Sequence, residues 1–152
     1  MDNLTEFKLR PPKMGDYPKL LELTYIAQAQ YCNLLMWILC FPGTPIILMI
    51  YLFINTYIIC EHTTSRKVVG FISFHKVPFK EQAILPYFSV DREFREMKIG
   101  TTLMVEALNQ IKERGFKKVL VSVNYDNVKA RRLLEKQGFI LKKGRVVYEL
   151  KI

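Results

Sequence analysis

The 152-residue sequence is poor in the residues that build metal sites and disulfide frameworks. It contains three cysteines, Cys32, Cys40 and Cys60, and two histidines, His62 and His75. An odd number of cysteines in apolar surroundings, without the spacing of metal ligands, argues against a disulfide-stapled fold and against a structural zinc site. We therefore expect no metal, and we expect buried free thiols in a reducing compartment.

Glycine and proline are also scarce, with seven of each. This scarcity excludes collagen and low-complexity chains, and the 50% content of hydrophobic residues is far above that of a disordered coil. No internal repeat or polar linker divides a chain of this length, so residues 1–152 are predicted to form a single domain. Residues 1–10 lack the apolar stretch of a secretory signal, which favours the cytoplasm.

Acidic residues are outnumbered, with 14 Asp and Glu against 23 Lys and Arg, which gives a formal net charge of +9 and a pI near 9.5. Such a surface attracts phosphates, acidic substrates or anionic lipid. The basic residues between Arg92 and Arg145 are scattered and lack a stacking aromatic platform or a known binding motif. Nucleic acid is therefore not an expected partner.

Charged residues are missing altogether from Leu23 to Cys60, a run of 38 residues. Within this run, residues 34–54 are numerous enough to span a bilayer as a helix. The sequence Pro-Gly-Thr-Pro at residues 42–45 would break that helix, and no Lys or Arg flanks the window closely. We favour two apolar elements joined by this turn, in an unusually apolar segment 31–60. The alternatives are a homodimer face or a membrane contact through residues 34–54.

Hydrophobic periodicity predicts strands and helices in mixed order, which is typical of an α+β or α/β fold. The predicted strands are 6–10, 56–60, 68–74, 83–90, 118–124 and 145–150, and the predicted helices are 16–30, 99–114 and 127–138. The second and third strands should form an antiparallel hairpin, and strand 118–124 should lie inside the sheet. Asp16 is the expected N-cap of the first helix, and Asn127 is that of the last helix.

One turn has the properties of a phosphate-binding site. It follows strand 83–90, carries Arg95 and Lys98, and leads into a helix that opens with Ile99, Gly100 and Thr101. The first N–H groups of a helix lack intrahelical partners, and the helix dipole adds partial positive charge there. The glycine allows close approach of a ligand to the backbone. Taken alone, the turn fits an ordinary helix start with solvated basic residues equally well.

Two segments, in the right order and at the right separation, resemble the signature motifs of the GCN5-related N-acetyltransferase (GNAT) superfamily. Val90–Gly100, VDREFREMKIG, resembles the loop that binds the acyl-CoA pyrophosphate, and Asn127–Phe139, NVKARRLLEKQGF, resembles the helix beside the cofactor. The resemblance is good over residues 68–152 and weak before them. It implies a mixed, mostly antiparallel sheet flanked by helices. It also implies transfer of an acetyl group from acetyl-CoA to a primary amine of a small molecule or protein.

The resemblance further implies how the cofactor is held. Loop N–H groups would bind the pyrophosphate, and the preceding strand would pair its main chain with the pantetheine arm. A bulge would splay that strand from its neighbour and leave a main-chain N–H near Phe88 for the thioester oxygen, and Pro86 suits such an irregular strand. The implied cofactor-binding residues are Phe88, Ser89, Val90, Arg95, Glu96, Met97, Lys98, Ile99, Gly100, Thr101, Asn127 and Lys129.

Two positions depart from the family pattern. Lys98 occupies the first glycine position of the loop, which costs about 1–2 kcal/mol if φ is positive there. Leu134 occupies the position of the tyrosine that usually protonates the departing thiolate. A positioned acid contributes roughly 10²–10⁴-fold, whereas a thiol with a pKa of about 8.5 already leaves tolerably near neutrality. We therefore expect slower chemistry or another proton donor, with Tyr125 and Tyr87 as candidates.

No residue is a clear base for the proton of the acceptor amine. Glu61, His75 and Glu81 lie near the ends of predicted strands. His75 titrates in the useful range, although a lone histidine after an apolar strand is more often a surface or satisfied residue, and water could carry the proton instead. The candidate catalytic groups are thus the main chain of Phe88 and the side chains of Tyr125, His75 and Glu61.

Two other functions stay open on sequence grounds. Leu134 also suits a catalytically weak CoA-binding or regulatory module, since it cannot donate a proton. The charge-free run suits a membrane-associated acyltransferase. The acceptor itself cannot be read from the sequence.

Overall fold

The computed structural model describes residues 6–28, 54–142 and 147–152. The chain order is β1 (Phe7–Arg10), α1 (Tyr17–Gln28), β2 (Thr56–His62), β3 (Val68–Lys76), β4 (Gln82–Val90), α4 (Ile99–Glu113), β5 (Lys118–Ser122), α5 (Val128–Lys136), β6 (Ile140–Leu141) and β7 (Val147–Lys151). Single 3₁₀ turns at Met14–Asp16 and Arg92–Phe94 precede α1 and α4. None of the helices among these residues is both long and apolar enough to cross a bilayer.

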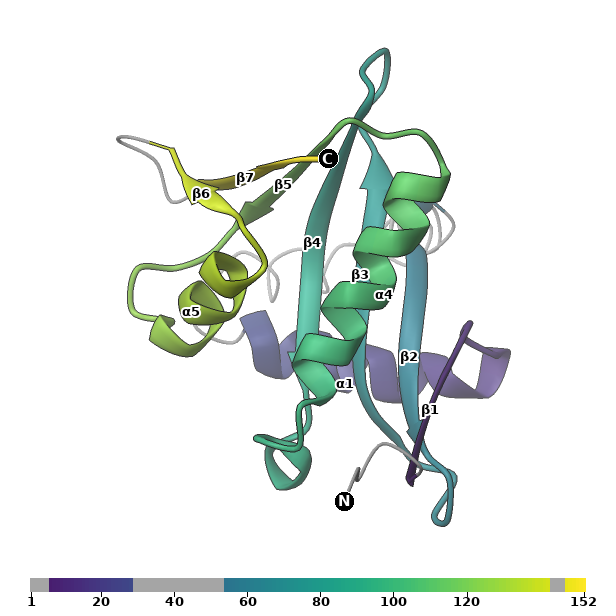
Figure 1. Cartoon of the computed structure of the whole chain (residues 1–152). Helices are drawn as coiled ribbons and strands as arrows, with labels where there is room; N and C mark the ends of the chain where they lie inside the picture. Colours follow the sequence, from purple (N-terminus) through teal and green to yellow (C-terminus); the bar gives the residue numbers. More distant parts are fainter. Residues whose placement is uncertain (1–5, 29–53, 143–146) are drawn as a thin grey trace, which may run out of the picture.

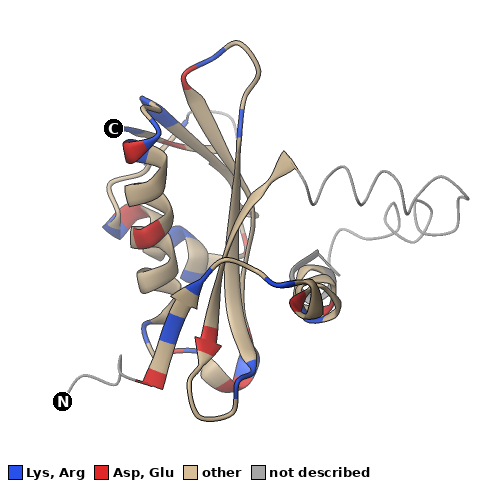
Figure 2. Ribbon diagram, turned by 90° about the vertical axis from the view of Figure 1, so that its right-hand side faces the viewer, with Lys and Arg blue, Asp and Glu red and all other residues tan. Residues whose placement is uncertain are grey.

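The strands form one twisted sheet in the order β1-β2-β3-β4-β5-β7-β6 (Figure 1). All neighbouring pairs are antiparallel except β4 and β5, which are parallel. Helices α4 and α5 lie on one side of the sheet and α1 lies on the other (Figure 2). The predicted α+β class and the mixed, mostly antiparallel sheet are confirmed.

Strands β2 and β3 are buried along most of their length because helices cover both faces of the sheet. Ile58, Ile72 and Phe74 pack into a core beneath α4, whereas Ile59 and Phe71 pack into a smaller core beneath α1. This two-sided burial explains why these segments read as nearly continuous apolar runs rather than as alternating ones. The predicted hairpin between them is confirmed.

Helix α4 presents one apolar stripe to the larger core, with Ile99, Leu103, Met104, Ala107 and Ile111 buried. Leu108 is only partly buried against the same core. Gly115, at a φ of +76°, follows the helix in the left-handed conformation that glycine adopts freely.

The structure corrects the sequence analysis at several element ends. Asp16 closes a 3₁₀ turn, and its carboxylate accepts hydrogen bonds from the Lys13 N–H and the Arg10 guanidinium, so the predicted N-cap of α1 serves the preceding turn instead. Strand β6 was not predicted because two residues carry no periodicity. The predicted elements of segment 31–53 and the predicted strand start at residues 145–146 lie outside the described residues.

Candidate active site

The sheet opens between β4 and β5. These strands pair only from Gln82 to Leu85, opposite Lys118 to Val121. Beyond Leu85, β4 continues beside β3 alone, so the two parallel strands diverge. The predicted splay of the sheet is thus present, at the strand where it was predicted.

A β-bulge in β4 accompanies this divergence. Tyr87 lies opposite Ser73, but Ile84 lies opposite His75, so β4 has one more residue than β3 over the same stretch. The bulge interrupts the alternation of side chains along β4. As a result, Leu85 and Phe88 both face the α4 core although they are three residues apart. Pro86 lies within the extra stretch, where a residue without an N–H is tolerated. The predicted irregularity at Pro86 is confirmed.

The register also fixes the direction of the Phe88 main chain. The N–H of Asp91 donates to the Val69 carbonyl at 2.8 Å, which makes Val69 and Asp91 a hydrogen-bonded pair of the antiparallel ladder. Because such pairs alternate, Ser89 and Tyr87 bond to β3, and the N–H of Phe88 points the opposite way. It therefore points to the side from which β5 has diverged.

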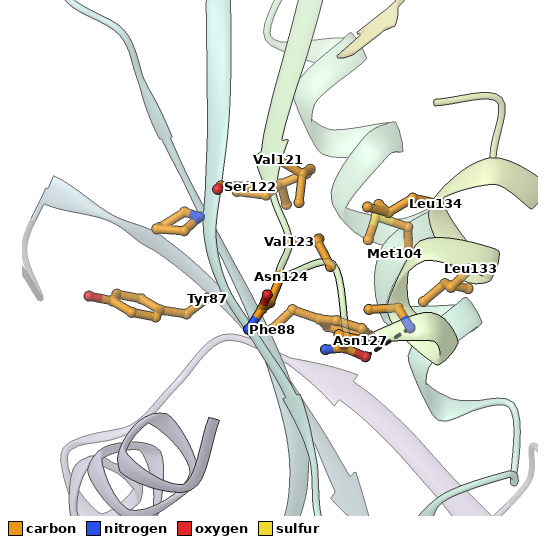
Figure 3. Close-up of a pocket in the computed structure, with 13 residues that line it drawn as sticks. Tyr87, Phe88, Met104, Val121, Ser122, Val123, Asn124, Asn127, Leu133 and Leu134 are labelled. Carbon is orange, nitrogen blue, oxygen red and sulfur yellow. Dashed lines mark hydrogen bonds between the residues drawn. The ribbon is translucent and has the colours of Figure 1, made fainter. Parts of the chain in front are cut away.

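A cavity of about 280 Å³ fills the space that the divergence opens. Its wall comes from β4, β5, α4 and α5 and consists of Leu85, Pro86, Tyr87, Phe88, Met104, Val121, Ser122, Val123, Asn124, Asn127, Ala130, Leu133 and Leu134. Figure 3 shows the ring of Phe88 directed towards the α5 side and the ring of Tyr87 directed the other way. The wall is more apolar than polar, which suits a ligand arm of low polarity.

The loop before α4 has an unusual backbone. Two non-glycine residues within three positions have positive φ, Glu96 at +71° and Lys98 at +60°. Lys98 is the N-cap of α4, and its carbonyl accepts the Thr102 N–H at 3.0 Å as the first bond of the helix. The N–H groups of Ile99, Gly100 and Thr101 therefore lie at the free start of the helix. Lys98 therefore has the positive φ at which we predicted a cost for it.

Gly100 joins this helix start to the cavity. A Cβ atom on Gly100 would stand 3.0 Å from Cζ of Phe88 and 3.8 Å from Cδ2 of Leu133, and both of these residues line the cavity. The loop and the cavity are therefore two parts of one continuous site. A ligand with an anionic group at one end and a long uncharged arm matches this arrangement.

The start of α5 borders the same region. Asn127 accepts the Ala130 N–H with its side chain at 3.1 Å, which confirms the predicted N-cap. Lys129 forms an exposed ion pair with Glu96 at 2.8 Å, which links α5 to the loop. A hydrogen bond from Lys129 and its positive charge lower the pKa of Glu96. Lys129 thus lies beside the loop before α4.

Leu134 is buried and lines the cavity, with 2% of its surface exposed. Tyr125 is 58% exposed and does not line the cavity, and the Arg131 guanidinium stands 5.0 Å from its ring centre. Arg131 also donates to the Tyr148 hydroxyl at 2.9 Å and so ties α5 to β7. The position of the usual acid is therefore apolar, and Tyr125 stands at the edge of the site.

The candidate bases lie apart from Phe88. His75 is three residues along β3 from Ile72, the partner of Phe88, which is about 10 Å of strand. Its Nδ1 bonds to Oδ1 of Asn55 at 2.9 Å, and burial lowers its pKa. Glu61 lies two strands away, where Nε of Arg10 donates to it at 2.6 Å. The structure does not bring these side chains together with Phe88.

Glu81 lies at the far end of the sheet, where it pairs with Lys117 at 2.6 Å. Sequence reasoning missed other members of the site, namely Met104, Ser122, Val123, Asn124 and Leu133. Asn124 lies in the part of the chain that the resemblance covers. Its position after a buried strand and just before the helix cap was the signal that could have marked it as a site residue. Met104 carried no signal beyond the apolar stripe of α4.

The comparisons with known proteins match this geometry. The sequence model of the acetyltransferase (GNAT) family matches residues 28–139, which is most of the chain. The chain belongs to the GNAT acetyltransferase family. It is therefore an acyltransferase of a family that uses acetyl-CoA. No curated protein sequence matches this GNAT acetyltransferase.

Three solved structures illustrate the shared fold. A GNAT acetyltransferase of Staphylococcus aureus is similar with a TM-score of 0.74 and 17% identity, over 95% of this chain and 98% of that one. The PaiA N-acetyltransferase of Thermoplasma acidophilum, in complex with coenzyme A, has a TM-score of 0.68 and 18% identity, over 96% and 99%. The ribosomal-protein-alanine N-acetyltransferase of Escherichia coli has a TM-score of 0.70 and 17% identity, over 96% and 94%. Identities this low establish the fold alone.

Proposed function

We propose that residues 1–152 act as one cytoplasmic N-acetyltransferase domain, which transfers the acetyl group of acetyl-CoA to a primary amine of a small molecule or protein. The observation that carries this proposal is the continuity of the loop, the helix start and the cavity through Gly100. Acetyl-CoA carries a diphosphate at one end and a thioester at the other. It therefore requires a continuous path, with hydrogen-bond donors at the diphosphate and apolar walls towards the thioester.

The main chain supplies both sets of donors. Of the loop from Arg95 to Thr101, the N–H groups after Arg95 would bind the diphosphate, because the Arg95 N–H donates to the Arg92 carbonyl at 3.4 Å. The left-handed conformations at Glu96 and Lys98 turn the loop onto the start of α4. The N–H of Phe88 would donate to the thioester oxygen, on which negative charge grows as the amine attacks. A fixed donor aimed at such an oxygen is typically worth about 3 kcal/mol of transition-state stabilisation.

The side chains supply little acid–base chemistry. As the carbon–nitrogen bond forms and the carbon–sulfur bond breaks, the amine must lose one proton and the thiolate must gain one. Leu134 cannot donate, so we propose that water or Tyr125 delivers the proton to sulfur. Water would accept the proton of the amine, and His75, which lies about 10 Å of strand from Ile72, would act only through intervening water; an unchanged pH–rate profile for His75→Ala would eliminate His75.

The loop is tested by Gly100→Glu. The new side chain begins 3.0 Å from the Phe88 ring and puts a carboxylate beside the anion site, so calorimetry should detect no acetyl-CoA binding. Gly15→Glu is the matched control, because a Cβ there meets nothing within 4 Å and the residue lies before α1. Equal affinity in the two variants would remove the loop from its role.

A catalytically weak CoA-binding module is the second candidate, and the apolar environment of Leu134 favours it. The two functions are separated by release of free thiol from acetyl-CoA, measured with and without a panel of primary amines. Amine-dependent release supports the transferase, whereas tight binding without release on any amine supports the module.

A further inference from the structure

The hairpin between β3 and β4 projects beyond the other elements at one end of the sheet (Figures 1 and 2). At its tip, Val77 to Lys80 form a tight turn, in which the Lys80 N–H donates to the Val77 carbonyl at 3.2 Å. Phe79 is the most exposed large apolar residue described, with a relative exposure of 104%. The tip is at the far end of β4 from the proposed acetyl-CoA loop.

The backbone conformation of Phe79 is strained as well. Its φ is +60°, in the third position of a turn whose second residue is Pro78. This position of a type II turn requires positive φ and normally holds glycine or asparagine. The sequence therefore places a bulky aromatic where it strains the backbone and contacts solvent, and no packing within the described residues offsets that strain.

Cationic residues lie near the tip, of which Arg114 is held by Thr56, to whose Oγ1 it donates at 2.8 Å, and by the ring of Phe74, whose centre is 5.0 Å away. Lys76, Lys80 and Arg114 line a hollow of about 320 Å³ together with Phe79, and the one carboxylate there, Glu81, is paired with Lys117. Among the described residues, no carboxylate forms an ion pair with Lys76, Lys80 or Arg114. The tip thus combines one exposed aromatic ring with two lysines, Lys76 and Lys80, that form no ion pair among the described residues.

We propose that this tip docks on the surface of an anionic phospholipid bilayer, with the Phe79 ring inserted among the headgroups and the lysines beside the lipid phosphates. A fluid and negatively charged surface accepts a single projecting ring without shape matching. Aromatic rings favour this interfacial zone, and cationic side chains are attracted to anionic leaflets.

The test is co-sedimentation of the full chain with phosphatidylcholine vesicles, with and without phosphatidylserine. Phe79→Gly is the decisive variant, because it removes the ring and relieves the strained φ, so loss of binding cannot be ascribed to misfolding. We expect binding to the anionic vesicles to fall about tenfold. Phe79→Trp should retain binding, and Lys76→Gln combined with Lys80→Gln should remove most of the dependence on phosphatidylserine.

Ile140→Ser is the matched control, since Ile140 is also apolar, is 74% exposed and lies in β6 away from the tip; it should bind like the wild type. Acetyl-CoA affinity, measured by calorimetry, should be unchanged in Phe79→Gly, which keeps this proposal separate from the proposed function. Equal vesicle binding by Phe79→Gly and wild type, or no vesicle binding at all, would overturn the proposal. Binding of poly(U) RNA instead of vesicles, lost in Phe79→Gly, would assign the tip to nucleic acid and would also overturn it.

Discussion

Replacement of Lys98 by glycine should change stability and acetyl-CoA affinity in opposite directions. Lys98 holds a φ of +60°, which costs a residue with a Cβ about 1–2 kcal/mol. Glycine avoids this cost but loses about 0.5–1 kcal/mol more conformational entropy on folding. The net expectation is a gain of about 1 kcal/mol in the free energy of unfolding, or about 2–4 °C in melting temperature for a domain of this size.

The same substitution removes an ammonium group beside the proposed diphosphate site. Lys98 is exposed, so a charge contact there is worth at most about 1 kcal/mol, and acetyl-CoA affinity should fall by no more than about fivefold. Lys98→Ala is the control that separates the two effects. It keeps the strained backbone and loses the ammonium, so it should lose the same affinity without the gain in stability.

Urea denaturation measures the stability and calorimetry with acetyl-CoA measures the affinity. If Lys98→Gly and Lys98→Ala unfold at the same urea concentration, the left-handed backbone costs no more than the conformational entropy that glycine loses, and the predicted gain in stability is refuted. If both variants bind acetyl-CoA as tightly as the wild type, the ammonium does not contact the phosphates.

Three further predictions concern the acid, the partly buried histidine His75 and the ion-pair cluster at the edge of the sheet. Leu134→Tyr should raise kcat by up to about 100-fold in the thiol-release assay, and an unchanged kcat would mean that proton delivery to sulfur is not limiting. Burial lowers the pKa of His75 in the folded protein, so the unfolded chain takes up this proton first, and stability should fall as the pH drops below about 6.5; His75→Gln should flatten the curve of unfolding free energy between pH 7 and pH 5, and an identical curve would contradict this. Arg10→Met should cost roughly 2–3 kcal/mol at pH 7, because Asp16 and Glu61 lose their shared partner at 12% and 13% side-chain exposure. Arg10 lowers the pKa of Asp16, so the cost seen by urea denaturation should shrink as the pH approaches 4, and an equal cost at both pH values would show that the carboxylate charge is not its source.

Local signals sufficed for most of the fold. Val119 and Val121 share one face of β5, and the apolar residues of α4 recur at helical spacing. Periodicity alone therefore identifies one segment as a strand and the other as a helix. Asp16 was assigned to the wrong turn because a capping residue is recognised by its neighbours in sequence, whereas Arg10 and Lys13 decide where this carboxylate goes. Strand β6 was not predicted, because its pairing with β7 is a tertiary contact.

The candidate site divides in the same way. The loop before α4 and the Asn127 cap are contiguous in sequence, so their motifs identify them. The cavity is not contiguous, because Met104, Val123 and Leu133 meet only when α4, β5 and α5 close around the splayed strand. The distances of His75 and Glu61 from Phe88 likewise depend on strand register, which the sequence did not specify.

By itself, the order of residues determined the strands and helices, the loop whose amides start α4, and the family to which the chain belongs, because each of these rests on neighbours along the chain. Only the tertiary structure decided that β4 carries an extra residue, that the Phe88 N–H faces the gap beside β5, and that Phe79 stands alone at a charged tip. These features depend on which strands pair and where pairing ends, and that is settled by packing between segments far apart in the sequence.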